Sequence, residues 1–205
     1  MTAIQRDKLS AHDKLINAAR VLFYNYGITA TGIDAIVKRA GVAKKSLYNN
    51  FSSKDELIAV YLTVRHQEWL DLYQKRAARV TNPREGVMAV FDAYADHAGV
   101  AYEAGFRGCG LLNAAAELPA GAPGRQAIRQ HKEEVEAILN SHLCQLVSDP
   151  QRCRLLARHL AFLLEGSASR AVLEGKGNWV RQAGSMAKAL MEALWASPIA
   201  ALCRG

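Results

Sequence analysis

Apolar residues recur at intervals of three and four positions along nearly the whole chain, as expected when one face of an α-helix is buried. Near the start, Ala18, Ala19, Leu22 and Phe23 form one such stripe. The strict apolar and polar alternation typical of a half-buried strand is almost absent. We therefore predict an all-α protein of about nine helices.

Short polar motifs and glycines mark where these helices begin and end. Ser, Thr, Asp or Asn at a helix start accepts hydrogen bonds from free N–H groups of the first turn, and glycine commonly ends a helix. Such starts occur at Ser10-x-x-Asp13, Thr31-x-x-Asp34, Ser53-x-x-Glu56, Asn82-Pro83 and Asp149-Pro150. The predicted helices cover about residues 10–27, 31–41, 43–51, 53–80, 82–103, 111–118, 125–147, 151–174 and 179–195.

Residues 31–54, TGIDAIVKRAGVAKKSLYNNFSSK, predict two short helices that meet at Gly41-Val42. A helix-turn-helix of this kind places its second helix in the major groove of DNA. In that second helix, Leu47 falls on the side expected to be buried and Phe51 closes the same side, while the opposite side is basic and polar. This segment predicts a DNA-binding surface.

The exposed side of this helix carries residue types that suit DNA. Lysine meets phosphates or guanine O6 and N7, asparagine pairs with adenine, and small residues let a helix sit deep in the groove. Amide groups at the starts of the flanking helices also favour phosphate oxygens. The predicted DNA contacts are Thr31, Ala43, Lys44, Lys45, Ser46, Tyr48, Asn49 and Lys54. A capping role alone is the alternative for Thr31, and a purely solvated role is the alternative for Lys44, Tyr48 and Asn49.

Charge is unevenly distributed between this region and the rest of the chain. Residues 1–54 hold nine Lys/Arg and three acidic residues, a net charge of +6, whereas residues 55–205 hold 17 and 16, a net charge of +1. A basic head beside a near-neutral body favours a polyanionic partner for the head. We place a domain boundary near residue 54, inside a continuous helix.

Composition and motifs exclude several other classes. Half of the 205 residues are hydrophobic, which predicts a globular protein. The N-terminal stretch lacks the apolar core of a signal peptide, and no run of about 18 apolar residues predicts a membrane helix. The cysteines lack CxxC spacing, the histidines lack HExxH spacing, and neither a G-x-S-x-G elbow nor a phosphate-binding glycine loop occurs. We expect a cytoplasmic protein without a membrane segment, metal, cofactor or catalytic residues.

Residues 15–57 resemble the DNA-binding domain of the tetracycline-repressor (TetR) family of bacterial transcription regulators. The elements AxxLFxxxG, TxxxI, AGVxxxxLY and FxxKxxL occur in the family's order and spacing. The resemblance implies an all-helical homodimer whose body, residues 55–205, binds a small-molecule inducer and thereby loosens its hold on double-stranded operator DNA. Val37 replaces the family's usual alanine, and Asn50 replaces a common histidine or aromatic. The resemblance places Thr31, Lys44, Ser46, Tyr48, Asn49 and Lys54 where family members touch DNA.

The last two predicted helices carry stripes of small and apolar residues. Two such helices from each of two subunits would form a four-helix bundle and hold two reading helices about 34 Å apart. Packing inside the same subunit is the alternative, because periodicity alone does not separate the two. The predicted dimer interface consists of Leu156, Leu160, Leu163, Ser167, Met186, Ala187, Leu190 and Leu194.

A mainly apolar ligand pocket with few polar anchors is expected among the middle helices. Its candidates, each of which can equally belong to the core or surface, are Phe91, Tyr94, Phe106, Cys109, Leu112, Asn113, Glu117 and His131. Cys109 is either a reactive thiol, activated by a nearby cation, or an ordinary buried cysteine.

The sequence predicts a ligand-responsive, dimeric repressor that binds a palindromic operator. A helical module for a small molecule or protein, whose basic head does not read DNA, is the alternative from another class. A nonspecific nucleoid-binding protein is a third possibility, and salt dependence and preference for one palindrome separate the three.

Overall fold

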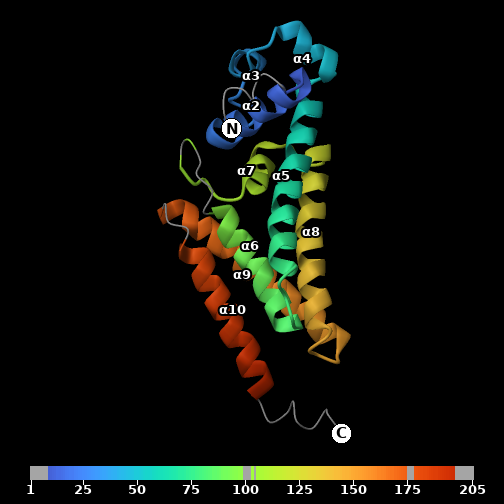
Figure 1. The fold of residues 1–205 in the computed structure, drawn as a ribbon, viewed down its shortest axis with the longest axis vertical. Helices are drawn as coiled ribbons and strands as arrows, with labels where there is room; N and C mark the ends of the chain where they lie inside the picture. The colour runs from blue at the N-terminus through green and yellow to red at the C-terminus, as the bar shows by residue number, and fades with distance from the viewer. Residues whose placement is uncertain (1–8, 99–102, 104, 175–177, 197–205) are drawn as a thin grey trace. The chain divides into compact units, whose positions relative to one another are not determined.

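The computed structural model describes residues 9–98, 103, 105–174 and 178–196, without the side chains of residues 98 and 194–196. These residues form nine α-helices and no strand, which confirms the predicted all-α class (Figure 1). Among them, no helix is both long and apolar enough to cross a membrane. The helices are α2 (Ala11–Tyr26), α3 (Ile33–Ala40), α4 (Lys44–Asn50), α5 (Lys54–Ala77), α6 (Pro83–Ala98), α7 (Gly110–Glu117), α8 (Pro123–Leu143), α9 (Pro150–Glu174) and α10 (Asn178–Ala196).

Four of the five predicted starting motifs cap their helices as expected. Ser10, Ser53 and Asn82 each accept a hydrogen bond, 3.1 Å long, from the backbone N–H three residues further on. Asp149 accepts one of 2.8 Å from the second residue after it. These bonds satisfy N–H groups that have no partner inside a helix, so local sequence is sufficient to start α2, α5, α6 and α9.

The fifth motif does not act as predicted, because Thr31 is not the cap of α3. The helix begins at Ile33 after Gly32, and no side chain caps it. The Thr31 hydroxyl instead donates to the carbonyl oxygens of Gly27 at 2.6 Å and Leu22 at 3.3 Å. Carbonyl groups at the end of a helix lack intrahelical partners. The Thr31 hydroxyl, which the sequence motif had placed as the cap of α3, therefore binds carbonyl groups at the end of α2 instead.

The helix predicted to reach Val147 ends earlier, and the helix predicted to reach residue 103 is described only in part. The helix expected to reach residue 103 is described as α6 up to residue 98; residues 99–102 lie outside the described residues, and Glu103 is in a turn. The helix expected to reach Val147 ends as α8 at Leu143. There the N–H groups of Leu146 and Val147 both donate to the Leu143 carbonyl at 2.9 Å, so the chain turns although its apolar pattern continues.

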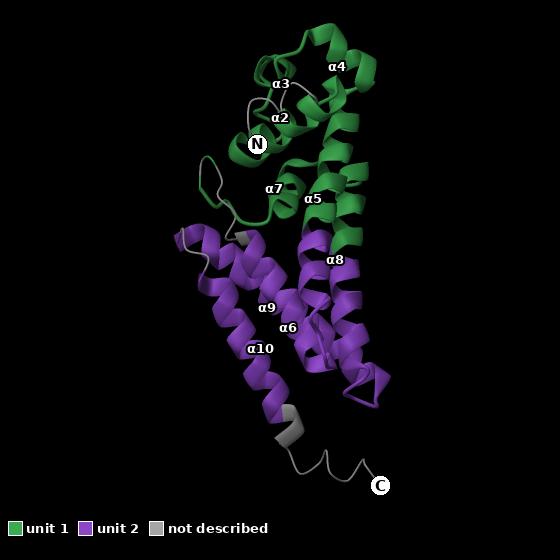
Figure 2. Cartoon of the chain, in the orientation of Figure 1, with its two compact units in different colours: residues 1–68, 103–131 green, residues 69–102, 132–205 purple. Residues whose placement is uncertain are grey.

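Contacts divide the chain into two compact units (Figure 2). Unit 1 contains residues 1–68 and 103–131, and unit 2 contains residues 69–102 and 132–205. The helices α5 and α8 therefore contribute to both units. The predicted functional domains, residues 1–54 and 55–205, stay a prediction.

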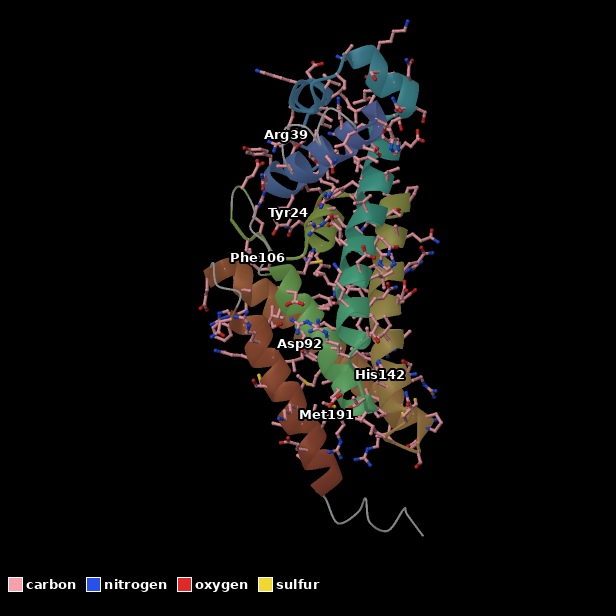
Figure 3. All side chains as sticks on the ribbon, viewed as in Figure 1. Tyr24, Arg39, Asp92, Phe106, His142 and Met191 are labelled. Carbon is pink, nitrogen blue, oxygen red and sulfur yellow. The ribbon has the colours of Figure 1, made fainter. Side chains whose placement is uncertain are left out.

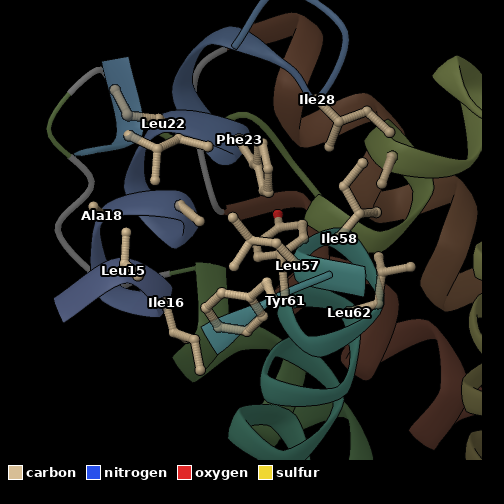
Figure 4. Packing of buried hydrophobic residues seen from close by; sticks show 14 of the residues in the cluster. Leu15, Ile16, Ala18, Leu22, Phe23, Ile28, Leu57, Ile58, Tyr61 and Leu62 are labelled. Carbon is tan, nitrogen blue, oxygen red and sulfur yellow. The ribbon is translucent and has the colours of Figure 1, made fainter. Parts of the chain in front are cut away.

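The core of unit 1 joins α2, α3, α4 and the first turns of α5. Figure 4 labels residues of α2 and α5 in this core. The side chains of Leu15, Ile36, Leu47 and Leu57, one from each helix, are completely buried. Burial of a side chain of this size contributes about 1.5–3 kcal/mol. Short helices such as α3 and α4 are marginal in isolation, so this shared core is what holds them in place.

The core of unit 2 consists of α6, α9 and α10 together with the second parts of α5 and α8. Small residues such as Ala187 on α10 and Ala157 on α9 are fully buried and let these helices approach closely. On α5, the Trp69 ring packs against the rings of Tyr73 and Tyr94, with centroids 5.7 and 5.4 Å away. Unit 2 thus has its own aromatic and aliphatic interior.

Candidate nucleic-acid interface

The seven-residue helix α4 is held from behind and exposed in front. Leu47 is its one buried residue, and Phe51 ends the helix with its N–H donating to the Leu47 carbonyl at 2.8 Å. The Phe51 ring is buried and stacks on His12 of α2, with ring centroids 5.1 Å apart. Burial of one side leaves the opposite side of α4 free to meet a partner.

The turn before α4 sets the direction of the helix. Gly41 ends α3 in the left-handed conformation, with φ 66° and ψ 36°, which glycine adopts without steric cost. The N–H groups of Gly41 and Val42 donate to the carbonyls of Lys38 and Val37, at 3.3 and 3.2 Å. A side chain at position 41 would strain the turn through which α4 is presented.

Seven of the eight predicted DNA contacts reach the surface, but the eighth, Thr31, does not. Tyr48 has an exposed fraction of 53%, which is high for a large aromatic side chain that could pack in the core. Thr31 has an exposed fraction of only 3%, and both hydrogen bonds of its hydroxyl stay within the protein. We therefore no longer include the Thr31 side chain in the predicted DNA-binding surface. Ala43, Lys44, Lys45, Tyr48 and Asn49 are exposed, and Ser46 and Lys54 are partly exposed.

One ion pair crosses from α4 to α3. Lys44 Nζ lies 2.8 Å from Asp34 Oδ1, and this hydrogen bond to Asp34 raises the pKa of Lys44. Both side chains are exposed, so water screens the pair and Lys44 can exchange Asp34 for a phosphate. At the end of α4, Asn50 Nδ2 donates to the Ser46 carbonyl at 2.7 Å. The Asn50 side chain, which differs from the common histidine or aromatic residue, thus forms a hydrogen bond within its own helix.

The segment before α7 is attached to the end of α2, which the sequence did not reveal. The Arg107 guanidinium donates to the carbonyls of Tyr24, at 3.2 Å, and Asn25. The Tyr24 hydroxyl accepts from the Arg107 N–H at 2.7 Å and donates to the Gly108 carbonyl at 3.2 Å. A cation at the C-terminal end of a helix is electrostatically favourable. The glycines of the RGCG motif at residues 107–110 predicted a break between helices, but they did not indicate this partner.

Two ligand candidates form hydrogen bonds to the backbone of unit 1. Glu117 of α7 accepts a 2.7 Å hydrogen bond from the Thr29 N–H, in the loop before α3. Asn113 donates to the Arg107 carbonyl at 2.7 Å, and Cys109 is the partly buried residue that precedes α7. Glu117 and Asn113 thus have structural hydrogen bonds that connect α7 to its surroundings.

The ligand candidates are divided between the two units. Phe91 and Tyr94 belong to unit 2, and the other six belong to unit 1. Phe106 and Leu112 are partly buried (Figure 3 labels Phe106). His131 is buried, and its Nδ1 lies 2.7 Å from Nδ1 of His66. In the described part of the chain, no group of three or more His, Cys, Asp or Glu residues is arranged to hold a metal ion.

A polar residue that the sequence did not single out lies near the aromatic group of unit 2. Lys132 Nζ is 5.7 Å from the centroid of the Tyr94 ring and 3.5 Å from Glu165 Oε1. The Trp69 ring also packs against Tyr94. One ion pair therefore lies beside the aromatic rings of unit 2.

The exposed apolar face of α9 lies beside the predicted stripe, not on it. The side chains of Leu155, Phe162 and Leu173 are exposed, whereas Leu156, Leu160 and Ser167 are buried in the subunit. Successive helical residues differ by about 100°, so a stripe that begins one residue earlier points elsewhere. Three of the four predicted α9 residues thus pack inside the subunit, and the dimer interface stays a prediction.

On α10 the predicted stripe is partly exposed. Met186 and Leu190 have exposed fractions of 59 and 40%, but Ala187 is buried. Leu163 of α9 is partly exposed, and the side chain of Leu194 lies outside the described residues. Five exposed apolar side chains define what we call the exposed apolar face of α9 and α10: Leu155, Phe162, Leu173, Met186 and Leu190.

An all-α chain with a helix-turn-helix and a polar, exposed second helix belongs to a well-populated class of DNA-binding proteins. Residues 15–61 match the family model described as bacterial regulatory proteins, tetR family. A solved structure of a putative TetR transcriptional regulator from Streptomyces avermitilis is 30% identical, with a TM-score of 0.70, and the match covers 88% of this chain and 99% of that one.

Two further relatives agree with this match. The solved structure of a TetR-family transcriptional regulator from Streptomyces coelicolor has a TM-score of 0.81 at 27% identity, covering 89% of this chain and 95% of that one. The transcriptional activator FasR of Mycolicibacterium smegmatis is 39% identical over 40% of this chain and 38% of FasR. The chain spans less than half the length of several curated relatives that it matches, FasR among them. The chain belongs to the TetR family of bacterial regulatory proteins.

Proposed function

We propose that this protein is a transcriptional regulator that binds double-stranded operator DNA through α4. The exposed basic and polar face of α4, supported from behind by Leu47, carries the proposal. Small residues lie at the start of the helix, Ala43 just before it and Ser46 in its first turn, and they let it lie deep in a major groove. Because DNA of a bacterial cell lies in the cytoplasm, we place the protein there.

Each residue of the α4 face has a proposed role. Lys44 and Lys45 neutralise phosphates or meet guanine, and Lys54 at the start of α5 neutralises a phosphate, which gives affinity and positions the helix. Asn49 pairs with adenine N6 and N7, and the Tyr48 hydroxyl donates to a phosphate while its ring covers the sugar. Specificity therefore depends most on Asn49 and the lysines that reach base edges.

We further propose that the active form is a homodimer bound to a palindromic operator. The exposed apolar face of α9 and α10 supports this proposal, because large apolar side chains such as Phe162 and Leu173 are costly to leave in water. A second copy of the chain placed on this face would bury both copies of it by two-fold symmetry. Two copies of α4 would then read half-sites about 34 Å apart.

We propose that a small-molecule inducer causes release from DNA, so that the protein acts as a repressor. Trp69, Tyr94, Lys132 and Glu165 in unit 2 support a ligand-binding body. The ligand would favour a subunit arrangement in which the two copies of α4 cannot occupy both half-sites. A coupling of about 1–3 kcal/mol would change operator occupancy by about 5- to 150-fold.

Salt dependence tests the DNA-binding proposal directly. With three lysines on each of two subunits neutralising one phosphate each, log K should fall with log salt at a slope of about −5. The measurement is fluorescence anisotropy with a palindrome selected from genomic fragments, at several salt concentrations. A slope near zero would favour the helical module without DNA reading. Equal affinity for random duplex would favour a nonspecific nucleoid binder.

A charged residue in the apolar face tests the dimer. Phe162→Glu is expected to weaken self-association by about 100-fold or more, because it removes an apolar contact and buries a charge in each subunit. Sedimentation velocity over a concentration series would show a shift from dimer to monomer. Gln126→Glu, at an exposed position of α8 and therefore outside this face, is the matched control and should remain dimeric. A dimeric Phe162→Glu protein would exclude this interface.

A further inference from the structure

A pocket of about 320 Å³ lies in unit 2 between α6 and α10. Its apolar part is formed by Met88, Phe91 and Ala95 of α6 and by Val180 of α10. This volume is at the lower end of the range of about 300–1,000 Å³ that is usual for small-molecule sites. We call it the α6–α10 pocket, and its apolar part suits a short aliphatic or aromatic group.

Gly184 lies where α10 faces α6 in the pocket. A Cβ atom at this position would lie 3.4 Å from Met88 Cε and 3.5 Å from Phe91 Cβ, which is ordinary van der Waals contact. Longer side chains one turn away on each side, Arg181 and Lys188, then stand at the edge of the pocket.

The charges around the pocket are arranged unequally. Arg76 forms a bidentate ion pair with Asp96, at 2.7 and 2.6 Å, and this pair raises the pKa of Arg76. Asp92 adds a second carboxylate on the α6 side (Figure 3 labels Asp92). On the α10 side, Arg181 and Lys188 form no ion pair with any acidic residue that the structure describes.

We propose that the α6–α10 pocket binds a small organic anion with an apolar tail, such as an aliphatic or aromatic carboxylate. Arg181 and Lys188 lie two helical turns apart, about 10 Å, so both flexible side chains can reach one carboxylate between them. The tail lies on Met88, Phe91 and Val180. A cationic ligand is disfavoured at this end, because Arg181 and Lys188 would repel it.

The pocket lies on a different side of α10 from the proposed dimer interface. At about 100° per residue, Lys188 is rotated by about 200° from Met186 and by the same angle from Leu190. A second subunit placed on Met186 and Leu190 would therefore leave Arg181 and Lys188 accessible. This site is independent of α4, and its occupancy is measured without DNA.

Isothermal titration of the full chain with octanoate tests the proposal. Octanoate should bind one site per chain with a Kd of about 1 mM or below. Octylammonium, with the same tail and the opposite charge, should bind about tenfold more weakly or worse. The Arg181→Met/Lys188→Met variant should lose about tenfold or more of the octanoate affinity. Its helical circular dichroism should be unchanged, because both side chains are exposed.

Two further variants make the test specific. Lys75→Met/Arg152→Met removes two exposed positive charges from unit 2 outside the pocket, and it should bind octanoate like the wild-type chain. Ala95→Phe fills the apolar part and should abolish binding. The proposal is overturned if octanoate does not bind, if octylammonium binds as tightly, or if the control variant loses as much affinity as Arg181→Met/Lys188→Met. None of these results depends on DNA binding, so the proposed function can fail or hold separately.

Discussion

Replacing both Lys44 and Tyr48 with alanine is expected to weaken operator binding by about 100-fold or more. Both side chains are exposed on α4, and a dimer would lose four contacts to DNA at once. Without the Lys44 side chain, a phosphate or a guanine loses its positively charged partner. Without the Tyr48 side chain, a phosphate loses a hydrogen-bond donor and the sugar loses the ring that covers it. Fluorescence anisotropy with the selected palindrome, at one fixed salt concentration, measures the change.

A matched control uses the same two residue types elsewhere. Tyr26 at the end of α2 and Lys75 near the end of α5 are exposed, and neither has a proposed contact with DNA. Tyr26→Ala/Lys75→Ala should bind the operator like the wild-type chain. Sedimentation should show unchanged dimers for both double variants. Wild-type affinity in Lys44→Ala/Tyr48→Ala would reject the α4 surface.

Leu47→Ala is expected to destabilise unit 1 by about 2–5 kcal/mol, whereas Tyr48→Ala should change stability by no more than about 0.5 kcal/mol. The two residues are adjacent on α4, but Leu47 is completely buried and Tyr48 is mostly exposed. Removing the Leu47 side chain leaves a cavity under the helix, which a seven-residue helix cannot compensate by its own hydrogen bonds. Urea denaturation followed by circular dichroism measures the difference.

These two variants separate a folding defect from a binding defect. Leu47→Ala should lose operator affinity because α4 is no longer held, and its urea midpoint should fall with it. Tyr48→Ala should lose affinity while the midpoint stays near that of the wild-type chain. Equal stability of the two variants would show that α4 is not docked through Leu47. Because the chain has two units, the transitions should be checked for more than one step.

Where a functional residue depends on local pattern, the sequence alone was sufficient. The all-α class, four helix caps and the short helix at residues 44–50 were predicted from spacing. Caps and turns are satisfied by neighbours within three or four positions, so their signal is present in a short stretch of sequence. The same is true of the burial of Leu47 and the exposure of Lys44 and Tyr48.

Where a residue had two possible partners, the sequence was not sufficient to predict which one it would contact. Thr31 was assigned to the start of α3, but its hydroxyl bonds to carbonyls of α2. On α9 the apolar residues occupy more than one face, and periodicity did not show that Leu156 and Leu160 face inward while Phe162 faces outward. Each choice depends on which groups of another element lie within reach, and that depends on packing.

The order of residues by itself determined the helical class, the helix-turn-helix and the basic face of its second helix, because each arises from interactions within one or two turns. Only the tertiary structure decided how Arg107 and Glu117 join the segment around α7 to the end of α2 and the loop before α3. It also decided that Arg181 and Lys188 stand at the edge of a pocket. Those arrangements join residues far apart in the chain, and their partners are chosen by burial and close packing, which no local pattern encodes.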